Sequence, residues 1–276
     1  MKRIFSLLLC CLLLAGCGAA PAADSASTIA ATTKPIYEFT AAIAAGTGIT
    51  VERLITEEVS CLHDHTLTVA QMRLLEKCDA VIVNGGGLED FMADTLPSKE
   101  TVIDASAGLT DGGDPHLWLD PKLASQMAKN IADGLIARYP EQQSKFRENL
   151  GNLQDKFLQL QAYAAVQTEA LPQREIVTFH DGFSHFANAL SLTVAACMEV
   201  EHGSEPSAKD LETIVTLVRE KRLPAVFTEV FGSADAANVV AKETGCKVFA
   251  LDMVMGKDDY FAAMRHNIDT VKEALS

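Results

Sequence analysis

Metal-binding side chains follow three predicted strands in the second half of the chain. His180 comes directly after the apolar run IVTF, Glu229 ends AVFTE, and Asp252 follows KVFAL. In open parallel sheets, the loops beyond the carboxyl ends of the strands converge on one crevice. Imidazole and carboxylate groups are common ligands of transition metals, so this edge is predicted to bind a metal ion.

The first half of the chain offers two more imidazoles on predicted loops. His63 lies in SCLHDHTL and His116 in DPHLWLDP, each just ahead of a predicted helix. The large separations along the chain rule out a local finger-type clip, so the fold must assemble any shared site. Three neutral imidazoles and one carboxylate would complete a tetrahedral Zn²⁺ site. With no position left for an activated water, this arrangement favours capture of the ion over hydrolysis.

The remaining histidines are interpreted more conservatively. His65 would face away from His63 on an extended loop, and His185 is displaced from His180 around a helix. Either could be an accessory or entry ligand. His202 and His266 are interpreted as ordinary surface residues.

Two further donors have an ambiguous role. Cys61 forms a C-x-H-x-H pattern with His63 and His65, but a disulfide or a buried thiol is favoured over a metal ligand. Glu229 could be the carboxylate ligand, or it could orient a ligand and cap the cleft, and the second role is favoured.

Strand and helix patterns alternate with short connections, which is typical of an α/β fold with parallel sheets. A β-prone segment near residue 28 runs into a helix at Pro35, and the buried run AVIV breaks at three glycines. Further elements follow throughout the chain. Strands are predicted at 49–55, 80–83, 175–179, 192–197, 225–229 and 247–251, and helices at 67–77, 120–138, 233–244, from Ser207 and from Asp258.

One predicted helix is unusually long. Apolar residues recur at spacings of three and four between residues 141 and 170, which indicates a helix of about 30 residues, on the order of 45 Å. We therefore expect two lobes, each with a central, mostly parallel sheet flanked by helices, joined by one long rigid helix. The expected boundaries are 28–139 for the first lobe, 140–171 for the linker helix and 172–276 for the second lobe.

The N-terminus predicts export. Lys2 and Arg3 precede an apolar run that ends at Leu14 and is too short to span a bilayer. The sequence LAGC then resembles a bacterial lipobox, which predicts a signal peptide over 1–16 and a lipid on the Cys17 thiol. Residues 17–27 would be a flexible tether, and the mature protein would lie outside the cytoplasm.

Charge and cysteine content constrain the partners. The formal net charge is −14, and the signal peptide contains basic but no acidic residues, so the mature chain is more acidic still. This acidic character argues against nucleic acid as a partner and suits a cationic ligand. Once the signal is cleaved and Cys17 is acylated, four thiols remain, and the sequence leaves open whether they pair within each half of the chain or stay free. They are Cys61, Cys78, Cys197 and Cys246.

These motifs together resemble a known family. The segments ATTKPIYEF, HDHTLT, DAVIVNGGGLEDF, DPHLWLDP, TFHDGFSHF, EPSAKDL, TEVF and ALD are similar to those of the solute-binding lipoproteins of zinc and manganese ABC importers, the ZnuA- and TroA-like family. The resemblance covers the chain from about residue 28 to its end. It implies that His63, His116, His180 and Asp252 are the metal ligands.

The same resemblance implies a function and partners. The protein would be a monomeric, membrane-anchored solute-binding protein, not an enzyme, that delivers Zn²⁺ to an ABC permease and its ATPase. Mn²⁺ is the alternative metal, because the loop before DPH is short and lacks the histidine-rich insertion of many zinc-specific members. Manganese-selective members, however, tend to carry glutamate where His180 stands, and imidazole suits zinc.

Three other functions remain open from the sequence. A zinc-dependent hydrolase could use three histidines, an open coordination position and Glu229 as general base. A protein of the same architecture could bind an iron chelate or cobalamin, although this needs an aromatic-lined cleft and the chain has one tryptophan. A surface adhesin is the third alternative.

Overall fold

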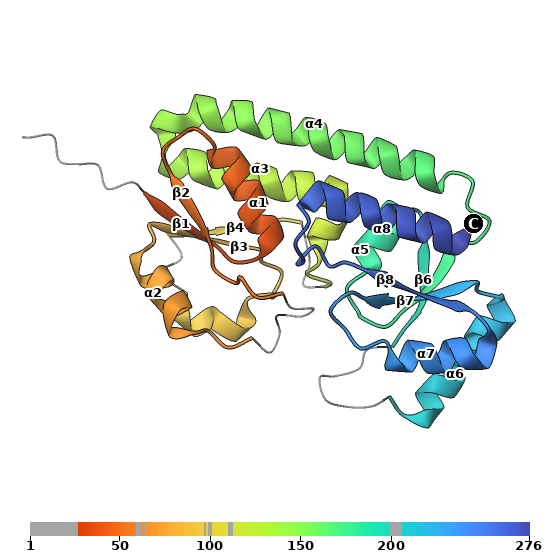
Figure 1. The fold of residues 1–276 in the computed structure, drawn as a ribbon. Coiled ribbons are helices and arrows are strands. Elements are labelled where there is room, and N and C mark those ends of the chain that lie inside the picture. Colours follow the sequence, from red (N-terminus) through yellow and green to blue (C-terminus); the bar gives the residue numbers. More distant parts are fainter. Residues whose placement is uncertain are drawn as a thin grey trace, which may run out of the picture.

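The protein folds into two parallel β-sheets covered by helices (Figure 1). The computed structural model describes residues 27–58, 62, 65–96, 98, 101–109, 113–198 and 206–276. Within these ranges each sheet has four strands, and all strand pairs are parallel. No helix of the described residues combines the length and apolar character needed to cross a membrane.

The first sheet has the strand order β2-β1-β3-β4. Local sequence signals fix its helices: Thr33 caps α1 with Pro35 in the first turn, and Thr68 and Gln71 form a capping box at α2. The elements are β1 (Thr28–Ala31), α1 (Lys34–Ala44), β2 (Thr50–Arg53), α2 (Val69–Lys77), β3 (Ala80–Val83), η1 (Asp90–Thr95), β4 (Val102–Asp104), η3 (Leu117–Leu119) and α3 (Pro121–Arg138).

The second sheet repeats this arrangement, with the order β6-β5-β7-β8. Ser207 caps α6 and Asp259 caps the final helix through side-chain oxygens that accept backbone N–H groups. The elements are β5 (Glu175–Thr178), α5 (Ser184–Ala189), β6 (Thr193–Cys197), α6 (Ala208–Lys221), β7 (Ala225–Glu229), α7 (Asp235–Thr244), β8 (Lys247–Leu251) and α8 (Tyr260–Leu275).

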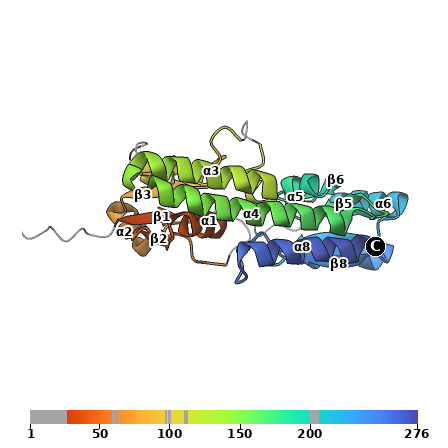
Figure 2. The same cartoon turned by 90° about the horizontal axis from the view of Figure 1, so that it is seen from above.

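One long helix extends over both sheets. After a short turn, η4 (Pro140–Gln142), helix α4 (Gln143–Thr168) runs for 26 residues, or about 39 Å at the usual rise. It packs on α1 and α3 of the first sheet and on α8 of the second. Figures 1 and 2 show it lying across the two halves, with α8 at its side. The two lobes and the long connecting helix expected from the sequence are therefore confirmed.

The two halves share a core. One cluster of buried apolar residues runs from β1 and α1 through α3 and α4 to β5, β8 and α8. Its largest fully buried members are Trp118, Tyr260, Phe39, Phe146 and Phe157. A smaller cluster lies between the second sheet and helices α6 and α7. Because interiors are close-packed, a core that is continuous across the junction resists large hinge motions.

Most predicted elements form where the sequence places them, but strand β4 was missed. It has only three residues, too few to show a hydrophobic period of its own. The helix expected at His185 is α5, which has six residues. The long helix starts two residues later than predicted, because Pro140 begins a separate turn. It ends at Thr168.

The two described cysteines of the second lobe do not pair with each other. Strands β6 and β8, next to Cys197 and Cys246, lie at opposite edges of the second sheet, so these two residues cannot form a disulfide with each other. Cys246 and Cys78 are free thiols, and burial raises the pKa of Cys78. Cys61 and Cys17 lie outside the described residues.

Candidate metal site

The candidate ligands lie at the carboxyl ends of strands and in the loop before α3. His180 follows β5, Glu229 ends β7 and Asp252 follows β8, as predicted from the sequence. His116 is the residue immediately before η3. His63 lies outside the described residues, so its position stays a prediction.

A neighbouring carboxylate orients His116. The Oδ1 atom of Asp114 lies 2.6 Å from Nδ1 of the imidazole and 2.9 Å from the His116 backbone nitrogen. The His116 side chain is almost completely buried. A ring whose Nδ1–H donates to a carboxylate presents Nε2 as its acceptor, which is the arrangement that orients many zinc-binding histidines.

Asp114 is itself held in the charged form. Burial is the largest influence and raises the pKa of its carboxyl group, but hydrogen bonds and charge interactions with His116, and a smaller interaction with His185, outweigh burial and lower it. The Nε2 atom of His185, on α5, lies 3.0 Å from the backbone oxygen of Asp114. His185 therefore joins the second half of the chain to the loop that carries His116.

His116 and His180 meet across the two halves of the molecule. Their ring centroids are 5.5 Å apart with the planes at 80°, an edge-to-face contact. His180 is 7% exposed, and its Nδ1 lies 4.0 Å from Oε1 of Glu229, which is also buried. His180 thus contacts an imidazole of the first lobe and a carboxylate of its own lobe.

Asp252 is fixed by its own turn. Its Oδ1 accepts hydrogen bonds from the backbone nitrogens of Val254 and Met255, at 2.7 and 3.2 Å. The side chain of Asn267 binds both the backbone nitrogen and the oxygen of Asp252. Val254 has φ of 63°, which is costly for a β-branched residue. The strained turn holds the carboxylate in one orientation, with Oδ1 engaged and Oδ2 pointing towards Gly256.

A glycine lies close to each candidate side chain of the second lobe, namely His180, Glu229 and Asp252. A Cβ on Gly182 would lie 2.8 Å from Cδ2 of His180. A Cβ on Gly232 would lie 2.6 Å from Cγ of Glu229, and one on Gly256 would lie 2.9 Å from Oδ2 of Asp252. Each distance is too short for a real contact, so the backbone reaches these groups only because the residues are glycine.

The four predicted ligands are not all brought together within the described part of the chain. No three His, Cys, Asp or Glu residues there are close enough to hold one ion. His63 lies outside that part. His116 and His180 are adjacent, whereas the Asp252 carboxylate is engaged by its own turn, so the complete ligand set stays a prediction.

His65 has local partners in the first lobe. Its Nε2 lies 3.5 Å from Oε1 of Gln71, and its ring contacts Phe91 edge-on at 5.5 Å. These contacts stabilise the start of α2. A role as accessory ligand stays a prediction.

A second buried carboxylate supports the loop before His116. Glu89 accepts hydrogen bonds from the Thr32 hydroxyl and from the backbone nitrogens of Asn84 and Gly85, at 2.6, 2.7 and 3.0 Å. Burial raises its pKa to about 7, against the lowering effect of these donors. The Asn84 side chain then donates to the backbone oxygen of Pro115 at 3.0 Å.

Sequence reasoning assigned no role to Asp114, Trp118 or Tyr260. The D-x-H spacing is a signal for Asp114, because an aspartate can bond the backbone two residues on. No local pattern reveals the other two: Trp118 donates to Met253, 135 residues away, and Tyr260 to Trp118, 142 residues away.

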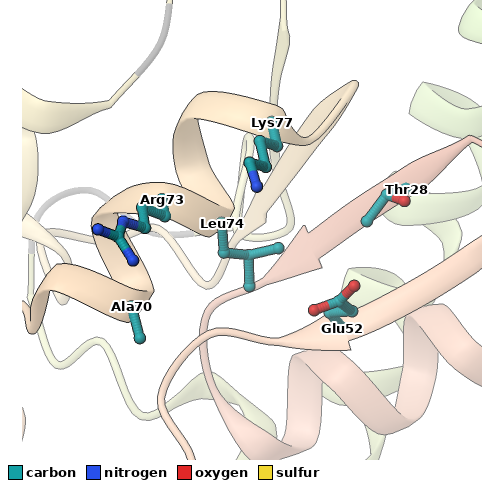
Figure 3. Close-up of a pocket in the computed structure, with 6 residues that line it drawn as sticks. All are labelled: Thr28, Glu52, Ala70, Arg73, Leu74 and Lys77. Atoms are coloured by element: carbon teal, nitrogen blue, oxygen red, sulfur yellow. The ribbon is translucent and has the colours of Figure 1, made fainter.

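The hollow drawn in Figure 3 is a separate feature. It encloses about 340 Å³ beside α2 and near the start of β1, at the opposite end of that strand from the candidate ligands. Its lining includes exposed side chains of both charges, the cationic Arg73 and Lys77 and the anionic Glu52. Its lining residues are Thr28, Glu52, Ala70, Arg73, Leu74 and Lys77.

Known proteins resemble the chain over nearly all of its length. The zinc-binding lipoprotein AdcA of Streptococcus pneumoniae (strain ATCC BAA-255 / R6) is 27% identical over 308 residues, which cover 99% of this chain and 61% of that protein. This chain thus spans about three fifths of that relative. The high-affinity zinc uptake system protein ZnuA of Bacillus subtilis (strain 168) is 25% identical, over 99% of this chain and 97% of that protein.

Solved structures and a protein family agree with this. A crystal structure of ZnuA superposes with a TM-score of 0.81 at 25% identity, covering 91% of this chain and 100% of that chain. Residues 29–274 match the family described as "Zinc-uptake complex component A periplasmic". The matched range spans the strands of both sheets, and the chain therefore belongs to this family.

Proposed function

We propose that the protein captures Zn²⁺ between its two lobes and delivers it to an ABC permease and its ATPase. The family, a relative named as a zinc-binding lipoprotein and a relative named as a zinc uptake protein support this function. Mn²⁺ is the alternative metal. Imidazole donors suit Zn²⁺ better than the harder Mn²⁺, which prefers oxygen.

The observation that carries the proposal is the contact between His116 and His180. Two buried imidazoles from different lobes lie with their centroids 5.5 Å apart, and the Asp114 carboxylate fixes which nitrogen His116 presents. We assign His63, His116 and His180 as the three nitrogen ligands and Asp252 as the oxygen ligand. One side chain per strand end or loop then encloses the ion from both lobes.

Glu229 has a different role from Asp252 in this proposal. Its Oε1 lies beside Nδ1 of His180 at 4.0 Å, which supports a carboxylate that orients the histidine ligand. Asp252 keeps Oδ2 for the ion while its Oδ1 is bound by the turn. A modest shift of that turn would complete the site when the metal enters.

Binding is favoured over hydrolysis. Four protein ligands fill a tetrahedral zinc site and leave no position for the activated water that a hydrolase needs. Glu229 beside His180 acts as an orienting group in this assignment, not as a general base. A zinc-loaded structure in which Asp252 does not coordinate the ion would favour the hydrolase instead.

The location follows from the N-terminus. The mature protein would be held at the extracytoplasmic face of the cell membrane by a lipid on Cys17, with residues 18–27 as a tether. The acidic character of the chain suits a cationic cargo. The protein would work as a monomer. No nucleic acid takes part.

Zinc affinity, measured by competition with a chromogenic chelator, tests the site. Loss of a residue that only hydrogen-bonds a metal ligand can weaken binding by about 100-fold. His116→Ala and His180→Ala each remove a ligand itself and should weaken zinc binding by more than that. His266→Ala is the matched control, because this histidine is exposed on α8 and should leave affinity unchanged. Wild-type affinity in His116→Ala would contradict the proposal. Competition between Zn²⁺ and Mn²⁺ in the same assay ranks the two metals.

A further inference from the structure

Two buried hydrogen bonds connect the loop of His116 to the loop of Asp252. The Tyr260 hydroxyl donates to the Trp118 backbone oxygen at 2.7 Å. The Trp118 indole nitrogen donates to the Met253 backbone oxygen at 2.9 Å. Trp118 is two residues beyond His116, and Met253 is adjacent to Asp252. The indole thus bonds the two candidate ligand loops directly, and the phenol bonds the Trp118 backbone.

Tyr260 is anchored from a third element. Its backbone nitrogen donates to Oε2 of Glu38 on α1 at 2.7 Å. Lys34, one turn earlier on α1, pairs with Oε1 of Glu38 at 2.7 Å and also donates to the backbone oxygen of Asp258. Helix α1 of the first lobe is therefore bonded directly to the start of α8 in the second.

The Tyr260 ring is enclosed by aromatic neighbours. Phe39 and Phe157 pack against it edge-on, with centroids 4.9 and 5.5 Å away. Tyr260 and Trp118 are each 1% exposed. Burial raises the pKa of Tyr260 well above its usual range, so the hydroxyl stays a neutral donor. In this dry setting a lost hydrogen bond is not replaced by water.

We propose that Tyr260 is a positioning residue of the metal site, whose hydroxyl holds Trp118 and, through the indole, keeps the His116 and Asp252 loops at a fixed separation. This inference rests on the proposed metal-binding function. Groups held in place before the ion arrives lose less freedom when it binds. Tyr260 contacts no ligand, so it acts on affinity only through the two loops.

Tyr260→Phe removes the hydroxyl and retains the ring packing and the bond to Glu38. Zinc affinity should fall by about tenfold, as for loss of an outer partner of a metal ligand. The matched control is Tyr163→Phe, which removes a hydroxyl that donates to Oδ1 of Asp269 at 2.6 Å between α4 and α8. It should bind zinc as the wild type does.

A second measurement reads the connection without any metal. The chain has one tryptophan, so its indole N–H gives a single resonance in a ¹⁵N-labelled sample. In metal-free wild-type protein this proton should exchange slowly with solvent. In Tyr260→Phe it should exchange at least tenfold faster, whereas in Tyr163→Phe it should stay slow.

The outcomes separate the two proposals. A wild-type protein that does not bind zinc would refute the proposed function whatever Tyr260 does. Tyr260→Phe with wild-type zinc affinity or unchanged indole exchange, even with a lower melting temperature, would overturn the positioning role. If Tyr260→Phe does not fold, rapid indole exchange in the metal-free wild type would overturn it and slow exchange would support it.

Discussion

The Nδ1 atom of His116 lies 2.6 Å from Oδ1 of Asp114, two residues earlier in the chain. The same oxygen also accepts the His116 backbone N–H, so one carboxylate fixes both the loop and the ring. His185 binds the Asp114 backbone oxygen from α5. Metal affinity should therefore depend on Asp114 although it is not a ligand.

Asp114→Asn tests this dependence. The amide keeps the shape of the side chain but removes the charge that stabilises the oriented imidazole. Zinc affinity should fall by about 10- to 100-fold, as for other outer-shell partners of metal-bound histidine. Competition with a chelator at constant pH measures the change.

The control for this variant is Asp133→Asn. Asp133 lies on α3 and pairs with Lys129 at 2.6 Å with both side chains exposed, so its loss should change stability by less than about 1 kcal/mol and leave zinc binding intact. Equal effects of the two substitutions would mean that the Asp114–His116 bond has no special role.

Gly182→Ala should disturb His180 directly. The new Cβ would lie 2.8 Å from Cδ2 and 2.9 Å from Nε2 of this ring, and 2.7 Å from Cε of Met253. Either the imidazole or the strand end must move, and we expect at least a tenfold loss of zinc affinity because ligand geometry is tightly constrained. Titration of the folded variant measures it.

Gly151→Ala is the matched substitution. Gly151 lies inside α4, where an added Cβ would meet nothing within 4 Å. Alanine should stabilise the protein by about 0.5–1 kcal/mol and leave zinc affinity unchanged. A Gly182→Ala protein that binds zinc like Gly151→Ala would show that the close approach at His180 is not needed.

Glu89 should make stability depend on pH. Its pKa is about 7 in the folded protein, raised by burial from 4.5. The native state therefore keeps a proton that the unfolded chain releases, and stability falls as pH rises from about 4.5 through about 7. Above that window the loss is complete, on the order of 3 kcal/mol.

Denaturant unfolding of Glu89→Gln across this range checks the assignment. The glutamine cannot ionise, so the loss of stability between about pH 5 and pH 7.5 should be smaller than in the wild type by up to a few kcal/mol. Glu148→Gln, on the exposed face of α4, controls for loss of any carboxylate. Parallel pH profiles for wild type and Glu89→Gln would refute the raised pKa.

Much of the fold was predictable because its signals are local. Alternating strand and helix patterns, proline at the start of α1 and the Asp120 cap of α3 each act within a few residues. Parallel strands place their carboxyl ends at one edge, which is why His180, Glu229 and Asp252 could be assigned to one side of the second sheet. Strand β4 was missed because three residues carry no period.

The contacts that hold the site together could not be predicted, because they join distant segments. Nothing in the neighbourhood of Trp118 indicates that its indole binds the Met253 backbone. His185 was interpreted as displaced from His180, with an accessory role left open, and no local pattern indicates that it reaches across to Asp114. The cysteine pairing depends on strand order, which composition does not determine, and β6 and β8 turned out to be opposite edges.

Zinc affinity should fall as the solution is acidified. Imidazole binds metal only when neutral, so protons compete for every histidine ligand. The slope of log affinity against pH equals the number of protons displaced by the ion, and three histidine ligands should make it steeper than about one below pH 6. His116→Ala should reduce that slope by up to about one, because it removes one competing site.

Calorimetry between about pH 7.5 and pH 5.5, in buffers of different ionisation enthalpy, counts the released protons. Affinity that does not change over this range would exclude a site built on three imidazoles.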